Sequence, residues 1–176
     1  MKNESRKISY LLRHNPEDLE MDKEGWVDTM ALLEKLNLDM EHLMEIVENN
    51  DKNRFSFNED WTKIRANQGH SAKLGLNITF KEVQFPSTYY HGTEFLVKNS
   101  ILKHGLQARN RAYVHLSKDV NTAVNVGNRH TKRGDAVMVL EIDGNQMKRD
   151  GYKIYESENG VILVDDVPPK YIKMQG

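Results

Sequence analysis

Residues 55–71 read FSFNEDWTKIRANQGHS, and this stretch governs the interpretation of the first part of the chain. Aromatic residues alternate with polar ones on both sides of the turn Asn58-Glu59-Asp60, which is the pattern of a β-hairpin. After Arg65 the sequence continues as a run of hydrogen-bond donors around one glycine. The hairpin therefore leads into a polar segment that could bind an anion.

Three helices are predicted before this hairpin. Ile8, Leu11 and Leu12 form an apolar stripe that Asn15-Pro16 ends, because proline disfavours helix in the residue before it. Asp28 can cap a second helix, and a third carries apolar residues from Met40 to Val47. Three helices followed by a hairpin resemble a winged-helix module.

After a connecting segment at 73–86, the sequence pattern changes from mainly helical to mixed. We expect short strands and two interrupting helices, one at about 94–103 closed by Gly105 and the other at about 119–126 closed by Gly127. Ser117 stands where the second of these helices would have its N-cap. The strands are expected at 89–91, 112–116, 136–142, 152–155 and 161–164. The predicted fold class is α+β, with a helical lobe at 1–75 and a mixed α/β lobe at 76–176.

The charge is divided unevenly along the chain. All 176 residues together carry 25 basic and 26 acidic side chains, for a net charge of −1, but residues 1–75 have a net charge of −4 and residues 76–176 one of +3. Neither part has the basic excess of a protein that binds long stretches of nucleic acid. A bound polyanion must therefore be held by a few basic side chains at defined positions.

Several other classes of site are disfavoured by the composition. The chain has no cysteine, which excludes disulfides, thiolate zinc sites and a cysteine nucleophile. Its seven histidines do not show metal-ligand spacing, so we expect no metal. No apolar run is long enough for a membrane span, and residues 1–5 lack the apolar core of a signal peptide. We expect a cytoplasmic monomer without membrane contact.

Four places carry residues suited to chemistry. Arg13-His14 ends the first helix, where terminal carbonyls would favour a protonated imidazole, although a plain cationic C-cap is an equal reading. Residues 65–71 suit an oxyanion, or form a loop that satisfies its own hydrogen bonds. At 91–93, His-Gly-Thr is expected at a strand-to-helix turn, where glycine lets a ligand approach. The fourth place consists of residues 114–117 together with residues 126–130.

Taken together and in order, these motifs resemble the RNA 2′-phosphotransferase family. The resemblance covers nearly the whole chain. The matching segments are Leu11-Leu12-Arg13-His14, Gly25-Trp26-Val27, 64–71, Tyr90-His91-Gly92-Thr93, Val114-His115-Leu116-Ser117, Val126-Gly127-Asn128-Arg129, Asn159-Gly160-Val161 and 167–172.

The resemblance implies a fold and a reaction. The first lobe would be a winged helix and the second would be of the ADP-ribosyltransferase kind. The family transfers an internal RNA 2′-phosphate, as left at a spliced tRNA junction, to NAD⁺ without a metal. An ADP-ribosylated RNA phosphate forms first, and 2′-hydroxyl RNA, nicotinamide and ADP-ribose 1″,2″-cyclic phosphate are the final products.

The resemblance also implies roles for particular residues. The catalytic set would be Arg13, His14, Arg65 and Arg129. The 2′-phosphate and RNA would contact Arg13, Arg65, Gln68, His70 and Ser71. The NAD⁺ site would comprise His91, Gly92, Thr93, His115, Leu116 and Ser117. Whether His14 protonates the leaving RNA oxygen or only donates a hydrogen bond is open at this point.

One departure and two rival functions accompany this interpretation. Ile162 stands where the family commonly has an aromatic residue, which affects one packing contact rather than the chemistry. One rival is a one-step ADP-ribosyltransferase acting on terminal phosphates of nucleic acids. The other is a winged-helix nucleic-acid binder without activity, which the acidic first lobe disfavours.

Overall fold

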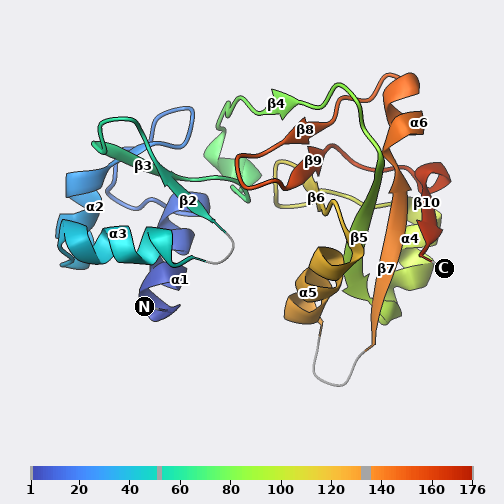
Figure 1. Ribbon diagram of the computed structural model, residues 1–176, viewed down its shortest axis with the longest axis horizontal. Helices are drawn as coiled ribbons and strands as arrows, with labels where there is room; N and C mark the ends of the chain where they lie inside the picture. The colour runs from blue at the N-terminus through green and yellow to red at the C-terminus, as the bar shows by residue number, and fades with distance from the viewer. Residues whose placement is uncertain (1, 51–52, 132–135, 176) are drawn as a thin grey trace. The chain divides into compact units, whose positions relative to one another are not determined.

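The chain folds into two compact units. The computed structural model describes residues 2–50, 53–131 and 136–175 (Figure 1). The first unit runs to Thr79 and also contains Asn110–Ala112, whereas the second unit holds Phe80–Arg109 and the chain from Tyr113 onward. Both combine helices with small antiparallel sheets, which confirms the α+β class.

The first unit consists of helices packed on a small sheet. The predicted hairpin is confirmed, since Phe55 pairs with Ala66 and Phe57 with Ile64. A short strand that the sequence analysis did not predict pairs Val27 with Ile64 and extends the sheet to the order β1-β3-β2. The elements are α1 (Lys2–Arg13), β1 (Val27–Asp28), α2 (Thr29–Leu36), α3 (Met40–Glu48), β2 (Phe55–Phe57), β3 (Lys63–Ala66) and the 3₁₀ turn η1 (Ala72–Leu74).

The apolar stripe predicted for α1 forms part of the core of this unit. Ile8, Leu11 and Leu12 are buried together with residues of α2, α3 and both hairpin strands. Pro16 follows the helix at the expected place, so α1 ends at Arg13 with the next residue outside the helix. The core therefore fixes the position of the α1 C-terminus against the sheet.

The second unit is built from two sheets and the helices around them. One sheet has the order β10-β7-β5 and the other the order β4-β8-β9-β6. Figure 1 shows α5 lying along β5. The elements are β4 (Lys81–Glu82), β5 (Thr88–Glu94), η2 (Phe95–Val97), α4 (Lys98–His104), β6 (Val114–Leu116), α5 (Val120–His130), β7 (Val137–Asp143), α6 (Gly144–Arg149), β8 (Tyr155–Glu156), β9 (Ile162–Val164), η3 (Pro169–Tyr171) and β10 (Ile172–Met174).

Three local predictions for this unit are wrong. Residues 91–93 lie inside β5 rather than at its junction with a helix. Helix α5 continues through Gly127 to His130, so this glycine does not end it. The N-cap of α5 is Asp119, whose carboxylate accepts a hydrogen bond from the Thr122 N–H at 2.7 Å, and not Ser117.

Close packing of α5 on β5 explains both glycines. A Cβ on Gly92 would overlap the carbonyl oxygen of Ala123 in α5, and a Cβ on Gly127 would lie 2.6 Å from Cγ1 of Val137. Helix and strand can approach this closely only where side chains are missing. The two glycines serve the contact between α5 and the sheet.

The other predicted ends of helices and strands agree with the structure to differing degrees. Gly105 closes α4 with a φ of +78° and donates its N–H to the Ile101 carbonyl at 2.7 Å, as predicted. The strand predicted at 152–155 begins only at Tyr155, and neither α6 nor β10 was predicted.

Candidate functional site

The end of α1 and the loop after the hairpin are joined by hydrogen bonds. The Ser71 N–H donates to the Arg13 carbonyl at 2.7 Å, and His14 Nδ1 lies 2.6 Å from the Ser71 hydroxyl oxygen. Two segments far apart in the sequence, Arg13-His14 and 65–71, therefore meet in the first unit. We refer to Arg13, His14, Arg65, His70 and Ser71 as the basic cluster.

Arg65 is held by the segment that precedes β1. Its guanidinium carbon lies 4.3 Å from the centroid of the Trp26 ring, and its Nη1 donates to the Glu24 carbonyl at 3.3 Å. A cation stacked on an aromatic face keeps its charge and loses conformational freedom. The Gly25-Trp26-Val27 motif thus positions one arginine of the cluster.

Gly69 lets the loop run against the side chain of Arg13. Its φ of +87° lies in the left-handed region that favours glycine, and a Cβ there would come within 3.2 Å of Arg13 Nε. The loop backbone therefore packs directly on this arginine.

His70 is the buried member of the cluster. Only 5% of the residue is exposed, and burial, followed by the charges of Arg13, Arg65 and His14, lowers the pKa of His70 to about 4. Its Nε2 lies 3.2 Å from where a Cβ of Gly25 would be. Within the described part of the chain, neither this nitrogen nor the buried Oε1 of Gln68 has a hydrogen-bond partner. His70 is therefore a neutral imidazole.

The expectation that His14 would be protonated is wrong. Burial lowers the pKa of His14, and the neighbouring charges of Arg13, Arg111 and Lys73 lower it further. Burial and these cations act against the helix carbonyls, whose influence is confined to the last turn. The positive charge of the cluster is carried by its arginines.

Arg111 was missed by the sequence analysis. The segment Asn110–Ala112 belongs to the first unit, where Arg111 forms an isolated antiparallel bridge with Ser71. The Ala72 N–H donates to the Asn110 carbonyl at 3.0 Å. Because this pairing joins residues 40 positions apart, no local pattern in the sequence indicated it.

In the second unit, the predicted residues gather where its two sheets meet. Tyr90 of β5 and Ser117 after β6 exchange backbone hydrogen bonds of 2.9 and 2.8 Å. Beside this bridge, His91 Nδ1 lies 3.1 Å from the carbonyl oxygen of His115. His91, His115 and Ser117 are all half-buried, so their polar groups lie at the edge of the core.

The remaining predicted residues of this group are placed differently. Leu116 is 2% exposed and belongs to the hydrophobic core of the second unit, so only its backbone is available to a ligand. The space beside Gly92 is taken by α5. Thr93 is half-buried, and Arg129 is exposed near the end of α5. Of the four predicted catalytic residues, three lie in the first unit and Arg129 lies in the second.

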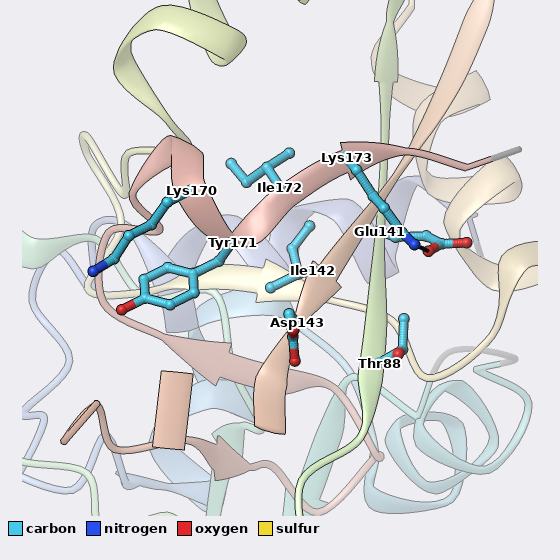
Figure 2. A pocket seen from close by; sticks show the side chains of 8 residues that line it. All are labelled: Thr88, Glu141, Ile142, Asp143, Lys170, Tyr171, Ile172 and Lys173. Carbon is cyan, nitrogen blue, oxygen red and sulfur yellow. Dashed lines mark ion pairs between the residues drawn. The ribbon is translucent and has the colours of Figure 1, made fainter. Parts of the chain in front are cut away.

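A shallow pocket of about 220 Å³ lies elsewhere on the second unit, and the predicted site residues do not line it (Figure 2). Its charged groups already interact, since Lys173 pairs with Glu141 at 3.3 Å and Lys170 lies 3.8 Å from Asp150. Its lining residues are Thr88, Glu141, Ile142, Asp143, Lys170, Tyr171, Ile172 and Lys173.

The described residues hold neither a candidate metal site nor a candidate membrane span. Within 2–50, 53–131 and 136–175, histidine and acidic side chains do not gather in threes as a metal ion would require. Over the same ranges, none of the helices combines the length and the apolar character needed to cross a bilayer.

Comparison with known proteins identifies the family. Residues 1–166 match the sequence pattern of the RNA 2′-phosphotransferase, Tpt1 / KptA family. A protein of Fusobacterium nucleatum named "Probable RNA 2'-phosphotransferase" is 48% identical over 175 residues, covering 96% of this chain and 95% of the relative. One of the same name from Flavobacterium johnsoniae is 49% identical over 179 residues, covering 97% and 94%. The chain therefore belongs to the RNA 2′-phosphotransferase family.

Proposed function

We propose that this protein is an NAD⁺-dependent RNA 2′-phosphotransferase that removes an internal 2′-phosphate, as at a tRNA splice junction. The observation that carries the proposal is the basic cluster, in which the end of α1 and the segment 65–71 meet around two neutral histidines. Family membership supports the same activity.

The cluster suits a phosphate dianion because its charge comes from arginines. A guanidinium binds phosphate oxygens with two parallel hydrogen bonds and does not lose its proton. Arg65 is already stacked on Trp26 and Arg13 is packed on the loop at Gly69, so little ordering is left for binding. A preorganised pair of this kind also stabilises charge that develops on phosphorus.

The proposed reaction has two steps. In the first, an oxygen of the RNA 2′-phosphate attacks C1″ of the nicotinamide ribose, and nicotinamide leaves with the bonding electrons. In the second, ribose O2″ gives up its hydroxyl proton and attacks phosphorus. The bond between phosphorus and the RNA 2′-oxygen breaks, and that oxygen takes up a proton. Arg13 and Arg65 would hold the phosphate oxygens, and the family resemblance proposes Arg129 as a further catalytic residue. His14, whose pKa is lowered, is neutral near pH 7 and so would donate a hydrogen bond rather than carry a charge.

The second unit has donors suited to NAD⁺. His91, Thr93, His115 and Ser117 offer imidazole and hydroxyl groups at the edge of the core, and each is half-buried. Leu116 and Gly92 would contribute through backbone groups, because the Leu116 side chain and the space beside Gly92 belong to the packing. We assign the first unit to the winged-helix type and the second to the ADP-ribosyltransferase type, and we expect a cytoplasmic monomer.

The test is nicotinamide release with three RNA oligonucleotides in the presence of EDTA. The first carries one internal 2′-phosphate, the second carries only a terminal phosphate, and the third carries neither. We expect one nicotinamide per 2′-phosphate with the first RNA, and 2′-hydroxyl RNA as the product. Release with the terminal phosphate alone would favour a one-step ADP-ribosyltransferase. A folded protein that releases no nicotinamide with any RNA would contradict both activities.

A further inference from the structure

We propose that Arg111 is a further phosphate-binding residue, which donates to the RNA 2′-phosphate beside His14. The inference rests on the proposed function. It adds to the site a residue that comes from a distant part of the sequence.

Backbone pairing determines where Arg111 lies. Arg111 and Ser71 face each other across an antiparallel bridge, and side chains of such a pair lie on the same side of the ladder about 5 Å apart at Cβ. On that side, the Ser71 hydroxyl is 2.6 Å from His14 Nδ1. Arg111 is therefore next to the pair that joins α1 to the loop.

Two backbone hydrogen bonds form this bridge. Ala72 N–H donates to the Asn110 carbonyl at 3.0 Å, and Ala112 N–H donates to the His70 carbonyl at 3.4 Å. These bonds flank Arg111 on both sides and fix its backbone, and its side chain is half-buried. Replacing the side chain leaves the backbone pairing in place.

The charges that act on His14 and His70 agree with this position of Arg111. The charges that lower the pKa of His70 are those of Arg13, Arg65 and His14, whereas those acting on His14 are Arg13, Arg111 and Lys73. The charge of Arg13 thus acts on both histidines, that of Arg65 on His70 and that of Arg111 on His14. An anion bound at His14 would be within reach of Arg111 as well as Arg13.

A further arginine also fits the charge requirement. Both histidines are neutral near pH 7, and a phosphate dianion has three oxygens that accept hydrogen bonds. Each arginine adds a planar guanidinium with parallel N–H donors, which the ammonium of lysine lacks. Arg13, Arg65 and Arg111 would each offer such donors to a bound phosphate.

The test measures binding of a short RNA with one internal 2′-phosphate, and of the same RNA without it, in the absence of NAD⁺. Arg111→Gln removes the charge, and Arg109→Gln is the matched control, because Arg109 is exposed, lies two residues away and belongs to the second unit. For Arg111→Gln we expect about tenfold weaker binding of the phosphorylated RNA only. Arg109→Gln should match the wild type on both RNAs.

Three outcomes would overturn the inference. Unchanged binding by Arg111→Gln would remove Arg111 from the site. An equal loss on both RNAs, or the same loss in Arg109→Gln, would assign the effect to general attraction of the RNA backbone. A wild-type protein that does not distinguish the two RNAs would instead overturn the phosphate site itself, and with it the proposed function.

A second variant guards against misfolding. Arg111→Lys keeps the positive charge and the aliphatic stem, and should bind the phosphorylated RNA about threefold more weakly because an ammonium lacks the planar fork. If Arg111→Gln does not fold, full affinity in Arg111→Lys overturns the inference.

Discussion

His70 is a neutral imidazole buried beside arginines, and this has a consequence for stability. Its pKa of about 4 in the folded protein lies below the ordinary value of 6.5. Between these two pH values the unfolded chain binds a proton at His70 and the folded protein does not. Acid therefore favours unfolding, and the stability that depends on a neutral His70 is complete above pH 6.5 and lost as the pH falls to about 4.

The prediction is a difference in acid sensitivity between two variants. Between pH 7 and pH 4, the free energy of unfolding of the wild type should fall by about 3 kcal/mol more than that of His70→Gln, which has no proton to take up. Urea unfolding at each pH measures this difference. His104→Gln, at an exposed position at the end of α4, should retain the wild-type slope. Identical slopes for wild type and His70→Gln would show that His70 titrates normally.

Arg65 is the arginine whose position is defined best, because Trp26 lies under its guanidinium. We expect Arg65→Ala to slow the second step by about 100-fold or more, so that ADP-ribosylated RNA accumulates. Lys63→Ala is the matched control, since Lys63 is a more exposed cation on the same strand. Gel analysis of RNA during a single turnover separates intermediate from product. Normal product formation without accumulated intermediate would contradict this role.

At the scale of elements, the contact between α5 and β5 depends on two glycines. We expect Gly92→Ala to lower the free energy of unfolding by about 3 kcal/mol or more, because the new Cβ would overlap the Ala123 carbonyl in α5. Gly151→Ala is the comparison, since a Cβ there meets no atom within 4 Å and only the φ of +98° is unfavourable. The free energy of unfolding of Gly151→Ala should fall by about 1 kcal/mol. Equal losses would show that α5 adjusts to a side chain.

The same contact shows why part of the second unit could not be predicted. A glycine within a polar tripeptide is typical of a turn, and one after an apolar run is typical of a helix end. Gly92 and Gly127 have neither role, because each is required by the element packed against it. By contrast, local signals sufficed for α1, for the hairpin and for Gly105.

Part of the candidate site was also readable from the sequence. The meeting of Arg13-His14 with the segment 65–71 could be expected from the family resemblance, and the structure brings these segments together. Arg111 reaches them through a pairing with a residue 40 positions away. The pKa of His14 is lowered by burial first and then by the charges of Arg13 and of that same Arg111. Both features depend on tertiary structure, so no local pattern could predict them.

At the scale of the whole molecule, the low net charge limits how RNA is held. If contacts are confined to Arg13, Arg65, Arg111 and Arg129, the logarithm of the binding constant should fall with the logarithm of salt concentration with a slope of about −3. Titrations of the 2′-phosphorylated RNA at several salt concentrations measure it. A slope of about −7 or steeper would indicate an extended basic groove, which the charge of −1 disfavours.

In the proposed reaction, the 2′-phosphate itself moves from RNA to the ADP-ribose moiety of NAD⁺. The most direct measurement follows an RNA whose single internal 2′-phosphate carries ³²P, mixed with the full chain, NAD⁺ and EDTA. We predict that the label first becomes joined to ADP-ribose on the RNA and then leaves as ADP-ribose 1″,2″-cyclic phosphate. Label that stays on RNA as a stable ADP-ribosylated end product, or that leaves as inorganic phosphate without consumption of NAD⁺, would contradict the account.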